Sequence, residues 1–362
     1  VRNSPIFLYT LFCVDLCATL KIFYNRSQKF TKGTSSHRAL QMSPEFCKFG
    51  RMRLKLLASV LLFAISSFGD TPKEGLALPA EQMEKWVKVT SLTMALDYKA
   101  AMDEAKAFRA MNEGAGCVLE NVVRISRYDD RGDTTALLQA GKLLEDCKAQ
   151  GLWDALRLFE SGYVKTETGS GIKGAMTTRS AAKMFEESKD LEARAFYAIY
   201  AYYLDQSLSW LPFKSDNRKE YLKILDEASL NSPRFWPLFL TPLVWMHYDR
   251  EEYGKALELV DRALSKAPNH PVFLQMRADM LYRQKRYGEA DSINESSAEG
   301  YIRRTGPTIR YWCAVLNLVR IYHDAGDKEK SREWKSRLNS QTFKALEKWM
   351  PVSRMDDLKD RD

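Results

Sequence analysis

Apolar residues along the chain recur at three- and four-residue steps, most clearly in EEYGKALELVDRALSKAPNHP at residues 251–271. At this spacing Tyr253, Ala256, Val260 and Ala263 lie on one face of a helix. Pro268 follows, and proline cannot continue a helix because it has no backbone N–H and clashes with the preceding turn. The pattern therefore predicts an amphipathic helix that ends before Pro268.

The same pattern returns after 34 residues. Tyr253 corresponds to Tyr287, Gly254 to Gly288 and Ala256 to Ala290 in the segment RYGEADSIN. A fixed period of this length is typical of stacked helix pairs, since one pair alone cannot bury both of its faces.

Residues 237–297 resemble the tetratricopeptide repeat (TPR) family. The family's second helix carries an aromatic residue, a small alanine at a close helix contact and a closing proline. The resemblance gives these roles to Tyr253, Ala256 with Ala263, and Pro268, and then to Tyr287 and Ala290. In the second unit Asn294 and Ser297 replace apolar or small residues and no proline closes the helix. We therefore expect that helix to be short or frayed.

Weaker copies of the pattern lie on both sides of this core. Residues 312–338 repeat it with Gly326-Asp327 at the turn, after an insertion of about seven residues around GYIRRTG. Upstream, residues 96–108 and 132–144 are predicted as second helices that carry Ala101 and Ala136. Residues 175–230 predict longer helices. One is an aromatic-rich helix at 193–210 that is buried on several sides, and another begins after an Asp216 N-cap.

No period-two alternation follows residue 70, so the predicted fold is all-α, a right-handed α-solenoid of antiparallel helix hairpins. The length of 362 residues and an apolar content of 45% suit such a globular array. The predicted parts are an N-terminal extension at 1–51, a signal peptide at 52–69, a linker at 70–82, an irregular helical-repeat region at 83–230, TPR-like repeats with a capping helix at 231–350, and a charged tail at 351–362.

The segment MRLKLLASVLLFAISSFGD at 52–70 has the three parts of a signal peptide: basic residues, an apolar run, and the small-x-small site Ser67-Phe68-Gly69. Its uncharged run from Leu56 to Gly69 is too short to cross a membrane, which takes about 20 helical residues. We expect cleavage after Gly69, a periplasmic or secreted protein, no stable membrane span after cleavage, and a translation start at Met52. A buried helix is the alternative for this run.

The location of the charges bears on the partner. Residues 1–55 hold ten Lys and Arg against two acids, whereas the rest of the chain has 45 of each sign. The formal net charge of +8 therefore belongs to the leader. Without it the protein has no basic excess to attract phosphates, and we expect no nucleic-acid partner.

Three cysteines follow the leader, and none forms a C-x-x-C pair. Cys117 is placed at the start of a first helix and Cys147 at the end of its antiparallel partner, so a disulfide between them is possible. Two free cysteines are the alternative. The third, Cys313, has too few His or Cys neighbours in the sequence for a zinc site, and we expect no metal or other cofactor.

Catalytic motifs are absent from the sequence. TGSGIKGAMTT at 168–178 lacks the Lys-Ser/Thr of a phosphate loop and the strand before it, so we interpret it as a loop between helices. The four histidines are scattered, and DDRGD at 129–133 has ordinary turn composition. We therefore predict a protein that is not an enzyme.

The resemblance to TPR proteins implies a concave groove, lined by the first helix of each hairpin, that binds a peptide or a partner helix. By position, the groove residues are Trp245, Tyr248, Asp279, Tyr282, Arg283, Arg320 and His323. Aromatic rings there supply apolar contact area and arginines pair with carboxylates. Trp245 and Tyr282 can instead be core packing between hairpins, which is the commoner use of aromatic stripes on helices.

The favoured function is a non-enzymatic scaffold that binds a protein or peptide outside the cytoplasm. One alternative is a periplasmic accessory subunit of a transport or envelope-assembly system, which predicts a deep apolar cavity for a small ligand. Two others are a cytoplasmic scaffold that uses the whole chain and an enzyme whose residues cluster only in the fold.

Overall fold

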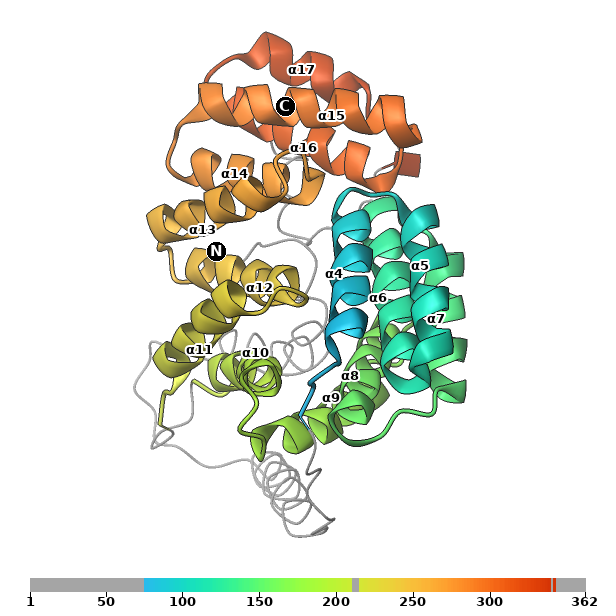
Figure 1. Ribbon diagram of the computed structural model, residues 1–362. Coiled ribbons are helices and arrows are strands. Elements are labelled where there is room, and N and C mark those ends of the chain that lie inside the picture. Colours follow the sequence, from blue (N-terminus) through green and yellow to red (C-terminus); the bar gives the residue numbers. More distant parts are fainter. Residues whose placement is uncertain (1–74, 210–214, 340, 343–362) are drawn as a thin grey trace, which may run out of the picture. The chain divides into compact units, whose positions relative to one another are not determined.

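The computed structural model describes residues 75–209, 215–339 and 341–342 (Figure 1). Fourteen α-helices and no strand occur in these ranges, which confirms the all-α prediction. The helices are α4 (Ala80–Met94), α5 (Tyr98–Met111), α6 (Glu113–Arg131), α7 (Thr134–Asp146), α8 (Gly151–Glu167), α9 (Gly171–Glu186), α10 (Leu191–Ser207), α11 (Arg218–Asn231), α12 (Trp236–Asp249), α13 (Tyr253–Lys266), α14 (Pro271–Arg283), α15 (Tyr287–Thr305), α16 (Ile309–Asp324) and α17 (Lys328–Ser336). The N-terminal extension, the signal peptide, nearly all of the capping helix predicted at 340–350 and the charged tail lie outside the described residues.

Each described helix packs against the next one along the chain. In addition, α6 touches α4, α8 and α16, and α10 touches α12. The array is thus a series of helix hairpins, the TPR-like α-solenoid that the 34-residue period predicts. The first helix of the described residues, α4, begins at Ala80, inside the segment predicted as linker.

Five hairpin turns have the same backbone geometry. In each, one residue takes a positive φ, and the amide after it donates to the carbonyl five residues earlier, at 2.7 to 3.0 Å. This is the Schellman closure of a helix, in which the left-handed residue is most often glycine. The left-handed residues are Leu96, Gly169, Glu251, Lys285 and Gly326. Glu251 and Lys285 are 34 residues apart, so the sequence period is also a period of turns.

Small residues permit close helix contacts. Ala256, Ala263 and Ala290, which the resemblance places at helix contacts, are fully buried. At Gly116 of α6, an added Cβ would lie 2.3 Å from the Cα of Arg109 in α5, so only glycine fits this crossing. At Gly174, an added Cβ would lie 2.7 Å from the carbonyl oxygen of Gly162 in α8.

The contact of Gly174 with α8 corrects the interpretation of residues 168–178 as a loop. Only Thr168 to Ser170 connect the two helices, and α9 already begins at Gly171. Gly174 therefore permits α8 and α9 to pack with their backbones nearly in contact, whereas Gly169 supplies the left-handed residue of the turn between them.

The prediction that the helix starting at Tyr287 is short is wrong. The helix α15 has 19 residues, and the side chain of Asn294 donates to the carbonyl of Ala290 at 2.9 Å. The buried amide thus finds a partner within its own helix. The segment GYIRRTG continues α15 to Thr305 instead of forming a separate loop.

Two further predictions concern α10 and α11. The aromatic-rich helix α10 buries Phe196, Ile199, Tyr202 and Tyr203, as its pattern predicts. The N-cap of α11 is Asn217 and not Asp216. Asp216 accepts from the backbone N–H of Arg218 at 3.1 Å and from its guanidinium, and these bonds hold the pKa of the Asp216 carboxyl below its ordinary value.

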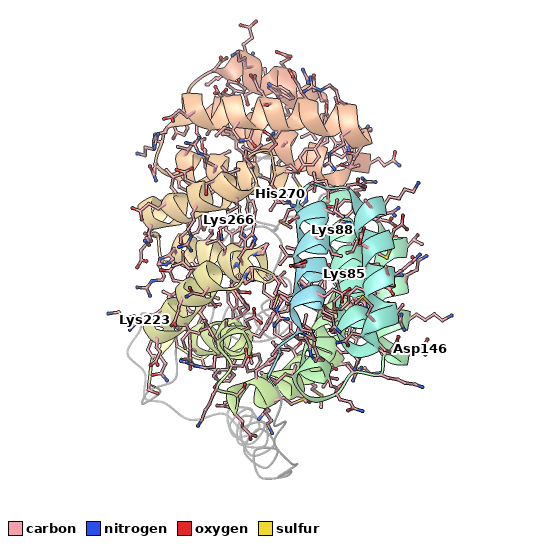
Figure 2. All side chains as sticks on the ribbon, viewed as in Figure 1. Lys85, Lys88, Asp146, Lys223, Lys266 and His270 are labelled. Carbon is pink, nitrogen blue, oxygen red and sulfur yellow. A yellow bond between two sulfur atoms is a disulfide. The ribbon has the colours of Figure 1, made fainter. Side chains whose placement is uncertain are left out.

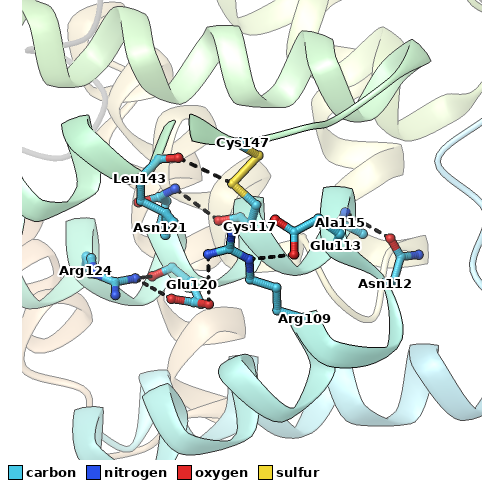
Figure 3. A network of polar contacts seen from close by, with 10 residues as sticks. All are labelled: Arg109, Asn112, Glu113, Ala115, Cys117, Glu120, Asn121, Arg124, Leu143 and Cys147. Atoms are coloured by element: carbon cyan, nitrogen blue, oxygen red, sulfur yellow. Dashed lines mark hydrogen bonds and ion pairs between the residues drawn. A yellow bond between two sulfur atoms is a disulfide. The ribbon is translucent and has the colours of Figure 1, made fainter. Parts of the chain in front are cut away.

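A disulfide joins Cys117, in the second turn of α6, to Cys147 at the end of α7 (Figure 3). Their Cα atoms are 6.0 Å apart, a distance that antiparallel neighbours provide at matching ends. Around it the start of α6 is ordered by Asn112, which caps the N–H of Ala115, and by Arg109 with Glu113 (Figure 3).

Candidate functional site

The seven residues predicted for the groove come from three first helices, α12, α14 and α16. Trp245, Tyr248, Asp279 and Arg320 are each at most 6% exposed, whereas the other three, Tyr282, Arg283 and His323, are partly exposed.

The structure brings these side chains together in one connected strip. The ring centroids of Trp245 and Tyr248 are 5.4 Å apart, and Arg283 donates from Nε to the hydroxyl of Tyr248. Arg320 stacks on the ring of Tyr282 at 5.1 Å.

The same strip continues across α14 and α16. The hydroxyl of Tyr282 donates to Asp324, which His323 also contacts at 3.1 Å. Asn317 donates to Asp279 at 3.4 Å. The strip is therefore occupied largely by its own contacts, and its role in partner binding stays a prediction.

A second candidate site, more enclosed than the strip, is a pocket between first helices from two distant parts of the chain. Residues of α4 and α6 form one wall of an apolar pocket, and residues of α12 and α14 form the other. The cavity has a volume of about 50 Å³, and its lining includes Trp86, Val89, Leu119, Leu238, Val272 and Phe273. Apolar surface far exceeds polar surface in this lining.

Arg234 links the helices around one part of the pocket. Its guanidinium is 3% exposed and lies 4.8 Å from the ring centroid of Phe235, 5.4 Å from Trp153 and 5.7 Å from Trp86. It pairs with Glu192 of α10 at 3.0 Å through Nε and donates to the carbonyl of Leu76 before α4. A buried arginine with a paired carboxylate and stacked rings has most of its charge compensated.

Asp129, Asp130, Arg304 and Arg310 link the end of α6 to α15 and α16, and we call these four residues the α6 clasp. Arg304 donates to both carboxylate oxygens of Asp130, at 2.9 and 3.0 Å. Arg310 donates to the backbone carbonyl of Asp129 at 2.7 Å. Because Asp130 is almost fully buried, removal of Arg304 would leave its carboxylate with only the guanidinium of Arg131, 3.7 Å away.

Two acidic side chains and one histidine bring polar groups into the pocket lining. His270, labelled in Figure 2, lies just before α14 and is 8% exposed. It packs on Phe273 with ring centroids 4.7 Å apart. Burial lowers the pKa of His270 to about 4, with the nearby Arg310 and Arg304 acting in the same direction and Asp130 opposing. Burial also raises the pKa of Asp129 well above its ordinary value. Because of its lowered pKa, the imidazole of His270 is neutral at neutral pH.

No local sequence pattern marks Trp86, Arg234 or His270 as members of one site, because they are far apart in the chain. The turn predicted at 129–133 is only Gly132-Asp133 in the structure, with Gly132 at a φ of +69° and Asp133 capping α7. Asp129 and Asp130 belong to the last turns of α6 and contribute to the pocket and the clasp. In the sequence, the adjacent acids Asp129 and Asp130 near the end of a helix were the only indication of this site.

A second cleft of about 400 Å³ lies over α5, α6 and α7. Arg124, Arg127 and Arg131 of α6 line it at helical spacing. Each has a carboxylate nearby: Glu120 at 2.9 Å, Asp133 at 2.8 Å and Asp130 at 3.7 Å, respectively. The cleft is thus close to neutral and offers little preference for an anion.

Within the described ranges, no group of three His, Cys, Asp or Glu side chains is arranged to hold a metal ion. In the same ranges no helix has the length and apolar character needed to cross a membrane.

The fold and the pocket together define a helical-repeat protein with a TPR-like α-solenoid fold and an internal, mostly apolar pocket. Three solved structures are similar over most of the chain. A Rap protein complexed with competence and sporulation factor is 16% identical, with a TM-score of 0.46, over 75% of this chain and 78% of the Rap chain. NprR in complex with its cognate peptide NprX is 12% identical, with a TM-score of 0.41, over 78% and 82%.

A TPR protein from Parabacteroides merdae is 15% identical, with a TM-score of 0.36, over 74% of this chain and 98% of its own. No protein-family model matches the chain, and no curated protein matches it. At these identities and TM-scores the ligands of the three proteins do not carry over to this chain, and its function has to be argued from the pocket.

Proposed function

We propose that this chain is a non-enzymatic scaffold that binds a protein or peptide partner and takes one side chain of that partner into the pocket between α4/α6 and α12/α14. The observation that carries the proposal is the pocket itself, whose mostly apolar walls come from first helices. In a TPR-like array these helices form the inner face. A buried apolar side chain contributes about 1.5–3 kcal/mol, so one anchor is a large share of a peptide's affinity.

The volume of the pocket supports the binding of a side chain rather than of a free small ligand. A cavity needs roughly 10–15 Å³ to hold one group of the size of a water molecule. The cavity of about 50 Å³ therefore holds about four non-hydrogen atoms. This is the size of a small branched side chain. Sites for drug-sized ligands have roughly 300–1,000 Å³. The small-ligand alternative predicts a deep apolar cavity, for which this pocket is too small. The cleft of about 400 Å³ over α5, α6 and α7 is large enough, but seven of its lining residues are charged.

The partner is expected to be a protein rather than nucleic acid, and the place of action is expected to be outside the cytoplasm. The neutral charge balance after Lys55 supports the first expectation. The signal-peptide pattern at 52–69 supports the second, as does the disulfide between Cys117 and Cys147, since disulfides persist mainly in oxidising compartments.

Peptide selection tests the binding function. A random library of displayed 12-residue peptides is selected on the purified full chain, and the affinities of the enriched peptides are measured by calorimetry. Val272→Phe places a ring at the half-buried rim of the pocket and is expected to weaken binding at least tenfold, from the burial energy above.

Val87→Phe is the matched control, because Val87 is a half-buried residue of α4 outside the pocket lining. It is expected to leave the affinity unchanged. If the Val272→Phe variant and the unchanged chain bind the peptide with equal affinity, the pocket does not hold the anchoring side chain. Failure of the selection to enrich any peptide would contradict the binding function as a whole.

The place of action is tested by the N-terminal sequence and intact mass of the protein from fractionated cells. An exported species that begins at Asp70 is expected. A cytoplasmic species that retains residues 1–51 would refute export and restore the basic extension as a candidate for phosphate binding.

A further inference from the structure

The walls of the apolar pocket contain polar atoms without a partner. Nδ1 of His270 forms no hydrogen bond within the described residues, although the side chain is 92% buried. Asp129 uses Oδ1 to accept from the hydroxyl of Tyr163 at 2.6 Å, but its Oδ2 has no partner in the same ranges. Both residues line the pocket. Buried polar groups are nearly always paired, so unpaired atoms around a cavity indicate that its occupant is polar at one point.

The unpaired atoms specify the kind of polar group. A hydroxyl both donates and accepts, so it can bond Nδ1 of His270 whichever ring nitrogen carries the proton. It can likewise bond Oδ2 of Asp129 in either protonation state. Arg234 also lines the pocket, and its Nη1 has no hydrogen-bond partner in the same described ranges, so it can donate to the oxygen of a hydroxyl. A charged group is unfavourable because the charge of Arg234 is already paired with Glu192, and the carboxylate of Asp130 is bonded at both oxygens by Arg304.

We infer that the side chain taken into the pocket carries a hydroxyl group, and that His270 makes the pocket select threonine over valine. Threonine and valine have the same shape and differ only in a hydroxyl for a methyl group. Both fit a cavity of about four water-sized groups. This inference rests on the proposed function and names the specificity of the same site. Burial keeps the imidazole neutral, with a pKa of about 4, so its preference is for a neutral partner.

The test starts from the selected peptides. An alanine scan of one peptide identifies the anchor as the position whose replacement weakens binding to the unchanged chain but not to Val272→Phe. Two synthetic peptides then differ only in threonine or valine at that position. We expect the threonine peptide to bind the unchanged chain about tenfold more tightly, the effect of one hydrogen bond to a group that is otherwise unpaired.

His270→Phe keeps an aromatic ring against Phe273 and removes the ring nitrogens, so the tenfold preference for threonine is expected to disappear or reverse. His270→Gln retains a hydrogen-bonding group and is expected to keep a preference for threonine. Val87→Phe, outside the pocket, is expected to keep the full preference.

The outcomes separate the two proposals. Equal affinities of the two peptides for the unchanged chain would overturn the hydroxyl inference alone, and the unpaired atoms would then be assigned to structural water. If His270→Phe and His270→Gln both retain the full tenfold ratio, the preference for threonine does not come from His270, and the assignment of the selectivity to His270 is overturned. Absence of any peptide that depends on the pocket overturns both proposals.

Discussion

Replacement of His270 by phenylalanine is expected to change how the stability of the protein depends on pH. The pKa of His270 is about 4 in the fold, against an ordinary value of 6.5, chiefly because burial disfavours the charged imidazolium. Arg310 and Arg304 lower it further, and Asp130 partly offsets them. The folded state therefore takes up the proton of His270 at a lower pH than the unfolded state does.

The sign and size of the effect follow from this difference. Between pH 6.5 and 4 the unfolded chain binds the proton and the folded protein does not, so stability falls as the pH falls through this range. One pKa unit corresponds to about 1.36 kcal/mol, so His270 removes about 2 kcal/mol at pH 5 and about 3 kcal/mol at pH 4. Well above pH 6.5 the imidazole is neutral in both states, and His270 no longer lowers the free energy of unfolding.

Urea unfolding followed by tryptophan fluorescence at pH 7.5 and pH 5 measures this contribution. Between these two values the unchanged chain is expected to lose about 2 kcal/mol more free energy of unfolding than His270→Phe. Other groups such as Asp129 are common to both proteins, so the difference between the proteins isolates the imidazole. If both proteins lose the same free energy to within about 0.5 kcal/mol, His270 is not buried as a neutral group and the account of the pocket is wrong.

Three further changes test the fold by thermal or urea unfolding. Gly116→Ala is expected to destabilise the protein by about 2–3 kcal/mol because its Cβ meets the backbone of α5, whereas Gly288→Ala, with open space around it, should stabilise by up to about 1 kcal/mol; equal effects would refute the close crossing. Lys285→Gly should gain about 1 kcal/mol by relieving a left-handed residue, and a loss would contradict that turn. A Cys117→Ser, Cys147→Ser double variant should lose about 3–4 kcal/mol, as expected for a bridge between residues separated by 30 positions, and no loss under oxidising conditions would argue against the disulfide.

The repeat core is the part of the fold that the sequence predicts best. The positions of Tyr253, Ala256 and Ala290 follow from local spacing, because helix faces are set by residues three and four apart. Gly326-Asp327 forms the predicted turn, and Asp327 caps α17 by accepting from the N–H of Lys330 at 3.0 Å. Local chemistry is sufficient for these features.

The length of α15 could not be predicted, because the polar Asn294 and Ser297 suggest an end to the helix. Both are buried in the structure, and Asn294 satisfies its donor on a carbonyl one turn earlier. A polar residue in a helix therefore breaks the amphipathic pattern without breaking the helix when its own backbone supplies the partner.

The pocket could not be predicted for a different reason. Its walls are contributed by residues separated by more than 100 positions, such as Trp86 and Phe273, and no periodicity relates them. The packing of α4 and α6 opposite α12 and α14 is a property of the whole array. The predicted groove residues, in contrast, lie on neighbouring hairpins, and their mutual contacts follow from the repeat.

The departure from the 34-residue period at GYIRRTG provides a link between the N-terminal helix α6 and the C-terminal helix α15. The inserted residues lengthen α15 and carry Tyr301 and Arg304. Arg304 stacks on Tyr301 at 5.5 Å and bonds both oxygens of Asp130, so the irregular part of the repeat supplies one side of the α6 clasp. A strictly periodic α15 would end before these residues and leave the buried Asp130 with only the guanidinium of Arg131, 3.7 Å away. The break in the repeat therefore supplies a link between α15 and the end of α6, which also lines the pocket.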